Sequence, residues 1–156
     1  MPPSRGSAEK SIPVPRARVS KEKNMTPSNS AEAAQIAVKE LEEKFGISIE
    51  KTEDGEAAST MQLLPHHRNF YGMPYGAVLF NLADVTCGMA YLSVGGNGVT
   101  VSGSVNYLRG ADKAAEALHC HAHVSKRGKR LCFINAEITD DRGRLLSTYN
   151  FIFSDI

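Results

Sequence analysis

The 156-residue sequence has little net charge and no long apolar run, and each scarcity excludes a class of protein. Its 18 Lys/Arg and 17 Asp/Glu residues leave a net charge of +1, whereas nucleic-acid-binding domains usually carry a strong basic excess. No apolar run reaches the length of a membrane-spanning helix, and the basic N-terminus lacks the apolar segment of a secretory signal. A hydrophobic content of 42% is typical of one globular domain. We therefore expect a cytoplasmic protein without nucleic-acid or membrane partners.

Metal-ligating side chains are also few or poorly spaced. The three cysteines lie singly among apolar residues and are expected to be reduced core residues: Cys87, Cys120 and Cys132. Three histidines alternate on one predicted strand, at His119, His121 and His123. They span about 13 Å, too far for one ion to bind all three, and no acidic residue is adjacent. We expect a polar sheet face or subunit interface there, and no metal or redox cofactor.

The first 24 residues differ in composition from the rest of the chain. They contain six Lys/Arg and two Asp/Glu residues, are rich in proline and serine, and show no hydrophobic period. This composition predicts a disordered basic tail over residues 1–24. Met25 follows directly, so translation is expected to start at either Met1 or Met25. The folded domain is expected over residues 25–156.

Hydrophobic periodicity within that domain predicts an α+β fold. Ser30 is the expected N-cap of a helix over 31–45, and Asp54-Gly55 is a hairpin-turn signal between two short strands. A helix that is apolar almost all round is expected over 76–92, and strand-like segments follow at 99–108, 116–126, 130–140 and 144–153. An antiparallel sheet should wrap this helix. Because such a sheet leaves two open edges, we expect a homodimer or homotetramer.

One carboxylate interrupts the apolar helix over 76–92. Five positions share its buried face, namely Leu79, Leu82, Ala83, Thr86 and Ala90. Asp84 lies next to that face about two turns into the helix, which excludes a capping role. A charge in such a place is costly unless it is paired or used. The spacing alone leaves two interpretations open: a catalytic base or nucleophile, or a carboxylate that faces solvent or binds a buried partner.

The residues before this helix suit a binding site at its N-terminus. Gly76 and Ala77 stand where the helix should begin, and free amides at such an end bind an anion or polarise a carbonyl oxygen. Glycine at that position lets a substrate approach the backbone closely, although it also merely suits a turn. Asn69 and Gly72 precede them in the loop. Asn69 is a candidate for orienting water or Asp84, or for bonding its own backbone.

These residues form a motif that resembles a known family. The stretch HRNFYGMPYGA, followed by Leu82-Ala83-Asp84, resembles the H-x-N-x-x-G-x-x-H-G-G and L-A-D motif of the PaaI-like hot-dog thioesterases (the 4-hydroxybenzoyl-CoA thioesterase superfamily). Asn69, Gly72, Gly76 and Asp84 match it without a gap. The similarity continues through VTVSGSVNYLRG, SKRGKRL and ITDDRGRLLSTYNFIF, over roughly residues 40–154.

The resemblance implies a hot-dog fold, in which a five- or six-stranded antiparallel sheet wraps a long central helix. It also implies hydrolysis of an acyl-CoA thioester in sites between subunits. Asp84 of one chain would be the base or nucleophile, and amides at Gly76 of the partner would stabilise the oxyanion. Asn69 would position water or the thioester, and Thr100 stands where relatives keep a water-binding Ser/Thr. Coenzyme A would enter as part of the substrate, with no separate cofactor.

The resemblance also names residues for substrate binding. Tyr75 replaces the motif histidine and is a poor proton shuttle at neutral pH, while Ala77 replaces its second glycine and is expected to narrow the acyl pocket. Gly72 belongs to the same loop. The remaining candidates are cations that would meet the phosphates of coenzyme A, namely Arg109, Arg127, Lys129 and Arg130.

Two other functions are compatible with the same fold. A non-catalytic acyl-CoA-binding protein is favoured by the loss of the motif histidine, and the presence of Asn69 and Asp84 opposes it. An acyl-thioester dehydratase would use a histidine before the helix and an acid inside it. His67 suits the first requirement, but the helix position holds Asn81, which cannot ionise.

Overall fold

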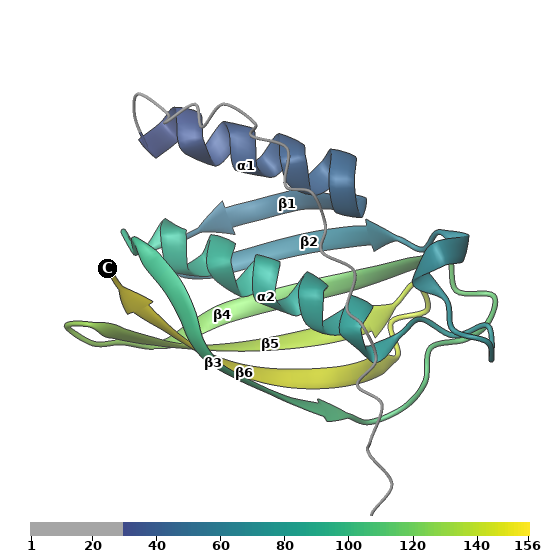
Figure 1. Ribbon diagram of the computed structural model, residues 1–156. Helices are drawn as coiled ribbons and strands as arrows, with labels where there is room; N and C mark the ends of the chain where they lie inside the picture. Colours follow the sequence, from purple (N-terminus) through teal and green to yellow (C-terminus); the bar gives the residue numbers. More distant parts are fainter. Residues whose placement is uncertain (1–29) are drawn as a thin grey trace, which may run out of the picture.

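The structure, a computed structural model, describes the backbone of residues 30–156 (Figure 1). The predicted tail over 1–24 lies outside the described residues. Within them, the chain forms α1 (Ser30–Phe45), β1 (Ile47–Glu53), β2 (Glu56–Gln62), η1 (Pro65–His67), α2 (Gly76–Ser93), β3 (Gly98–Tyr107), β4 (Ala117–Arg127), β5 (Leu131–Asp140) and β6 (Leu145–Asp155). The predicted order of two helices and six strands is confirmed.

The six strands form one antiparallel sheet in the order β1-β2-β4-β5-β6-β3. Figure 1 shows the sheet curving around α2, with α1 lying over β1 at one border. Successive side chains of a strand point to opposite faces of the sheet, so one face packs against α2 and the other is exposed. On β4, Leu118, Cys120 and Ala122 are buried toward α2, and the three alternating histidines point to the exposed face. The predicted wrapping of an apolar helix by an antiparallel sheet is confirmed.

Helix α2 is the centre of the core. The five residues predicted to share its buried face are all buried. The one polar group among them is satisfied, because the Thr86 hydroxyl donates to the Leu82 carbonyl at 2.6 Å and contacts the Ser59 hydroxyl at 2.5 Å. By length and composition alone, α2 is also apolar enough to cross a membrane. The prediction that no segment reaches that length was therefore wrong. Packing against the sheet accounts for the apolar composition of α2.

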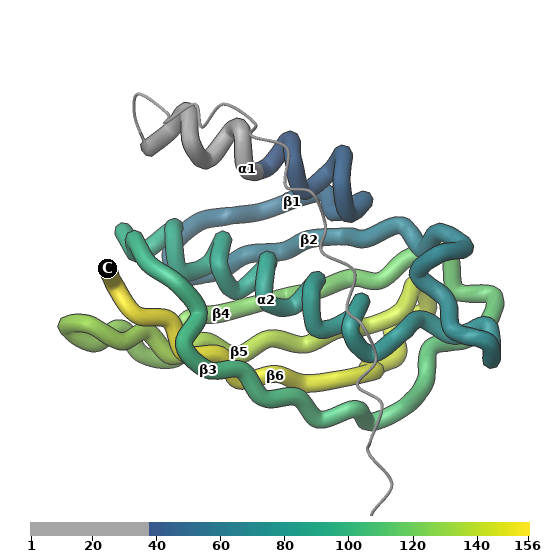
Figure 2. The backbone as a smooth tube through the Cα atoms, viewed as in Figure 1, coloured from purple at the N-terminus to yellow at the C-terminus, as the bar shows by residue number. Residues whose placement is uncertain are grey.

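Strand β3 forms one border of the sheet, and Figure 2 shows it passing close to α2. Within residues 30–156 it pairs with β6 alone, and almost every residue along it is exposed, including Val99 (53%) and Val101 (55%). A β-bulge lies between Thr100 and Ser102. Gly103 permits the close approach to α2, because a Cβ there would lie 2.8 Å from the ring of Phe80. The result is an uncovered edge strand held against the central helix.

Candidate active site

Among the described residues, one hydrogen bond reaches the Asp84 side chain, and it comes from β3. The Thr100 hydroxyl donates to Asp84 Oδ1 at 2.8 Å, beside the β-bulge that locally redirects the strand. Asp84 is half-buried on α2, and Thr100 is exposed. The structure therefore brings together two of the predicted catalytic residues. The second carboxylate oxygen, Oδ2, has no recorded donor among the described residues, so it is available to another group.

The N-terminus of α2 presents free amides at the surface. Tyr75, in extended conformation, is the N-cap, and its side chain makes no capping hydrogen bond. Within the described part of the chain, the amides of Gly76 and Ala77 have no recorded acceptor, and both residues are exposed. Free amides at a helix N-terminus attract partial negative charge. Tyr75, which replaces the motif histidine, is 49% exposed.

Tyr107 fixes the orientation of the first peptide of α2. Its hydroxyl donates to the Gly76 carbonyl oxygen at 2.8 Å. A Cβ on Gly76 would lie only 2.9 Å from that hydroxyl, so glycine makes room for the contact. Because the peptide bond is planar and trans, holding the Gly76 carbonyl also fixes the direction of the Ala77 amide. Sequence reasoning missed this role, although Tyr107 lies within the family-like segment VTVSGSVNYLRG.

Asp84 and the free amides lie too far apart to act on one carbonyl group within a single chain. Asp84 lies eight positions after Gly76, which corresponds to about 12 Å along the helix axis. A nucleophile and oxyanion donors must both lie about 3 Å from the reacting atoms. Within one chain, Asp84 and the free amides therefore lie at separate places along α2.

The loop before α2 is organised by its own side chains. Asn69 Oδ1 accepts from the amides of Tyr71 at 2.9 Å and Met73 at 3.2 Å, and Gly72 takes a positive φ of 81°. Arg68 binds three carbonyl oxygens, those of Gly72, Lys113 and Ala115. Sequence reasoning missed Arg68, because two of its acceptors lie more than 40 residues away. Asn69 makes no recorded contact with Asp84 of the same chain.

The predicted cations for coenzyme A fall at two places. Arg109 follows β3 near the N-terminus of α2, and it lines a cavity there. The other three lie at the β4–β5 hairpin, near the C-terminus of the chain in Figure 1. There, Arg127 Nη2 donates to both carboxylate oxygens of Asp155, at 2.8 and 2.9 Å. Within one chain, Lys129 and Arg130 thus lie at the end of α2 opposite Gly76.

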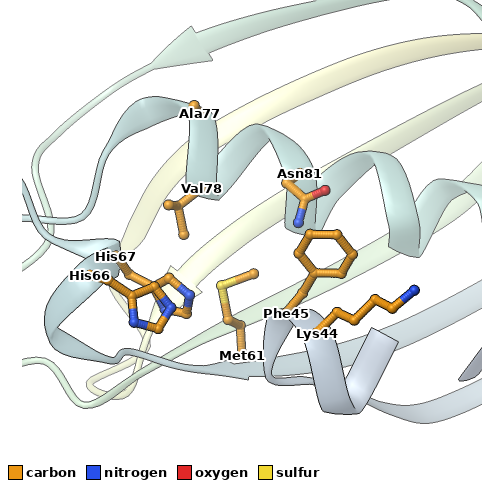
Figure 3. Close-up of a pocket in the computed structure, with 8 residues that line it drawn as sticks. All are labelled: Lys44, Phe45, Met61, His66, His67, Ala77, Val78 and Asn81. Atoms are coloured by element: carbon orange, nitrogen blue, oxygen red, sulfur yellow. The ribbon is translucent and has the colours of Figure 1, made fainter. Parts of the chain in front are cut away.

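Two cavities flank the first turns of α2. The first, here called the α1 cavity, has a volume of about 370 Å³ and lies between α1, η1 and α2 (Figure 3). The second, here called the Arg109 cavity, has about 380 Å³ and lies between α2 and the segment after β3. Ala77 lines the first and Gly76 the second. The first two residues of α2 therefore line different cavities.

The α1 cavity contains the residues considered for dehydratase chemistry. His67 and Asn81 both line it. Burial, together with the neighbouring His66, lowers the pKa of His67 below its ordinary value, so the ring is neutral at pH 7. Its Nδ1 accepts from the Leu64 amide at 3.2 Å. Because Asn81 cannot ionise, the cavity lacks the acid that such a pair needs.

Comparisons with known proteins reveal what this arrangement resembles. The family described as "Thioesterase superfamily" matches residues 71–147. Acyl-coenzyme A thioesterase 13 from Homo sapiens and from Pongo abelii is 30% identical over 104 residues, which cover 65% of this chain and 74% of each relative.

Solved structures agree with these matches. A hypothetical thioesterase from Streptococcus pneumoniae TIGR4, solved with coenzyme A, is 30% identical, with a TM-score of 0.65 and coverage of 69% of this chain and 84% of that protein. Two mutant structures of it replace an aspartate and, sixteen positions later, a threonine by alanine. The E. coli PaaI protein is 23% identical, with a TM-score of 0.73 over 80% of this chain and 89% of that one, and supports the hot-dog fold.

Proposed function

The chain belongs to the thioesterase superfamily and is a hydrolase acting on thioester bonds, and from that premise we propose that it hydrolyses acyl-CoA at sites shared by two subunits. Asp84 of one chain and the N-terminus of α2 of the other would form each site. The observation that carries this proposal is the separation of about 12 Å along α2. A second copy is the simplest way to place both halves around one carbonyl group.

Strand β3 offers the surface for that second copy. It is an edge strand with unpaired backbone groups, and its exposed apolar side chains include Val99 and Val101. Edge strands left open in this way pair readily with another chain. Thr100 lies on the same strand and binds Asp84. A two-fold pairing of β3 would therefore place each Asp84 at the interface, where isologous contacts repeat on both subunits.

The chemistry follows from the groups at each half-site. Asp84 accepts a proton from water, whose oxygen attacks the thioester carbonyl carbon. The amides of Gly76 and Ala77 donate to the oxyanion that forms. As the oxyanion collapses, the carbon–sulfur bond breaks, and Asp84 returns the proton to the departing thiolate. The products are the carboxylic acid and free coenzyme A. The Thr100 hydroxyl holds one carboxylate oxygen so that the other faces water.

The relatives support this assignment of residues and substrate. The streptococcal thioesterase was solved with coenzyme A, and a structure from Streptococcus mutans binds acetyl CoA. The aspartate and threonine replaced in the streptococcal mutants are separated by sixteen positions. Asp84 and Thr100 have the same separation and share a hydrogen bond.

The first experiment compares thiol release by the native protein and by Asp84→Asn. The substrates are acetyl-, octanoyl-, palmitoyl- and phenylacetyl-CoA. We expect turnover by the native protein and a loss of at least about 100-fold in the variant. Release by neither protein would leave a non-catalytic acyl-CoA-binding protein, and acyl-CoA binding measured by calorimetry would then identify it. Equal release by both would show that Asp84 is not the base.

A complementation experiment tests the shared site. Asp84→Asn and Gly76→Val are each expected to inactivate their own homodimer, since they disable opposite halves. In a mixed dimer, one site carries both defects and the other carries none. Refolding the two variants together should therefore restore about a quarter of native activity. No restoration, in mixtures shown by mass spectrometry to contain heterodimers, would contradict a site built from two subunits.

A further inference from the structure

The two cavities beside α2 differ in chemistry, although they are similar in volume. The α1 cavity is lined chiefly by apolar groups of Phe45, Met61, Ala77 and Val78. Lys44 also lines this cavity, but its charge is paired, because Lys44 Nζ forms a salt bridge with Glu40 at 3.2 Å. Figure 3 shows Met61 in the middle of the cavity, with Phe45 and the two histidines on either side. The α1 cavity therefore suits an uncharged apolar group.

The Arg109 cavity offers polar and cationic groups. Its lining includes Arg109, Tyr107, Gly76 and Gly110, beside four apolar residues, namely Pro74, Leu79, Leu108 and Ala111. The presence of Arg109 therefore distinguishes it from the α1 cavity. Arg109 is exposed. A guanidinium at the rim of a cavity is well suited to bind phosphate through bidentate hydrogen bonds. The Arg109 cavity therefore suits a polar, negatively charged group.

An acyl-CoA thioester has one apolar part, the acyl chain, and one negatively charged part, coenzyme A, and the two are joined at the carbonyl carbon. Gly76 lines the Arg109 cavity and Ala77 lines the α1 cavity, so the first turn of α2, with its free amides, borders both. A carbonyl oxygen bound to these amides would send one part to each side of the first turn of α2. On the foundation of the proposed function, we infer that the acyl group enters the α1 cavity and the coenzyme A part lies along the Arg109 cavity.

This orientation assigns a substrate class to the enzyme. A methylene group occupies about 30 Å³, close to the volume of a water molecule. The α1 cavity of about 370 Å³ therefore accommodates a straight acyl chain of roughly ten carbons. Phe45 of α1 forms its far wall and is 43% exposed. In the inferred orientation Phe45 would limit the chain length, and Ala77 lines the same cavity.

A chain-length series from butanoyl- to hexadecanoyl-CoA tests the acyl side. The specificity constant kcat/KM should rise about threefold to fourfold per methylene and stop rising near decanoyl. Phe45→Ala should move this break to longer chains, and Val78→Phe to shorter ones. Leu108→Ala, a matched change in the Arg109 cavity, should leave the break in place. A break that moves with Leu108→Ala, and not with the other two, would overturn the orientation.

A second series tests the coenzyme A side. Arg109→Gln should raise KM about tenfold for decanoyl-CoA, as expected when one charge-assisted contact is lost. The same variant should leave KM unchanged for decanoyl-N-acetylcysteamine, which lacks the nucleotide and its phosphates. Equal effects on the two thioesters would contradict a phosphate contact by Arg109 and overturn this half of the orientation.

Binding measurements separate the orientation from the catalytic proposal. In the Asp84→Asn background, calorimetric Kd values for the same acyl-CoA series should show the same break and the same shift with Phe45→Ala. If the native protein fails to release thiol but these Kd values show the break, the proposed hydrolysis fails and the orientation stands. If turnover is found and no break follows the α1 cavity, the orientation fails and the hydrolysis stands.

Discussion

Asp140 and Asp84 lie in different surroundings, and this difference indicates what each carboxylate can do. Asp140 ends β5 and is 1% exposed. It accepts from Arg144 Nε at 2.8 Å and from the amides of Arg142 and Arg144 at 3.1 and 3.0 Å, and it pairs with a second guanidinium nitrogen at 2.6 Å. Asp84, half-buried on α2, receives one hydrogen bond, from Thr100.

The difference lies in how many lone pairs are satisfied. Burial alone raises the pKa of Asp140, but the hydrogen bonds from Arg144 and Arg142 outweigh it and leave this pKa below its ordinary value. A carboxylate held so completely has no capacity left for a substrate or water. Asp84 keeps that capacity. Asp140 is therefore a structural carboxylate, whereas Asp84 has the acceptor capacity that its proposed role as a base requires.

The largest expected effect comes from making the same substitution at both positions. Asp84→Asn should lower kcat at least about 100-fold and change the free energy of unfolding by less than about 1 kcal/mol. Asp140→Asn should cost about 2–3 kcal/mol of stability, because it removes the partner of Arg144, and should leave kcat of the folded enzyme unchanged. Thiol release and urea unfolding measure the two quantities.

The crossed design supplies its own control, since each variant is the reference for the other. A large loss of stability in Asp84→Asn would show that this carboxylate supports the fold. A loss of kcat in folded Asp140→Asn would show that the end of β5 communicates with the site. Either result would erase the distinction between the two aspartates.

Removing the donor to Asp84 should have a smaller effect. Thr100→Val keeps the shape of the side chain and deletes the hydroxyl that holds Asp84 Oδ1. We expect kcat to fall about tenfold, the cost of one hydrogen bond to a charged group. Thr139→Val, a change on β5 away from this pair, should have no such effect. An unchanged kcat in Thr100→Val would mean that the contact does not orient the base.

A third carboxylate allows the same argument at the C-terminal end of α2. The Tyr91 hydroxyl donates to Asp155, which also binds Arg127. Tyr91→Phe deletes one donor and leaves the other, so the free energy of unfolding should fall by about 1 kcal/mol. Tyr71→Phe is the control, because Tyr71 is 59% exposed. If Tyr91→Phe lowers the free energy of unfolding as much as Asp140→Asn does, the stability contributed by a carboxylate does not depend on how many donors it loses.

The smallest expected effect is on the stability of the protein at acidic pH. Because the folded-state pKa of Asp140 lies below its ordinary value, its stabilisation is fully present above about pH 4 and is lost as pH falls through the folded pKa. The native protein should therefore lose stability more steeply than Asp140→Asn below about pH 4. Thermal unfolding at several pH values measures the two slopes. Parallel slopes would mean that Asp140 does not carry this acid sensitivity.

Much of the fold could be predicted from the sequence because periodicity reports burial directly. The outward histidines of β4 and the inward face of α2 follow from periods of 2 and 3.6. The strand order could not be predicted this way, since it depends on contacts between distant segments. The apolar length of α2 was also misjudged, because a core helix and a membrane span have similar compositions.

The candidate site could be predicted only where a role depends on residue type and local spacing. Asp84 and Thr100 were both named, and the structure brings them together. Arg68 and Tyr107 were missed because their roles depend on carbonyl oxygens supplied by other segments. Arg127 was named for coenzyme A, but its engagement with Asp155 depends on the end of β6. The catalytic and substrate-binding roles assigned to all of the named residues stay predictions.

The length of α2 between Gly76 and Asp84 has a consequence for how activity depends on concentration. If each site needs two chains, a lone chain carries every catalytic group and catalyses nothing. Specific activity would then fall on dilution below the dissociation constant of the dimer. It would return on concentration, without any ligand or modification. The amount of protein made by the cell would thus control the fraction of it that works.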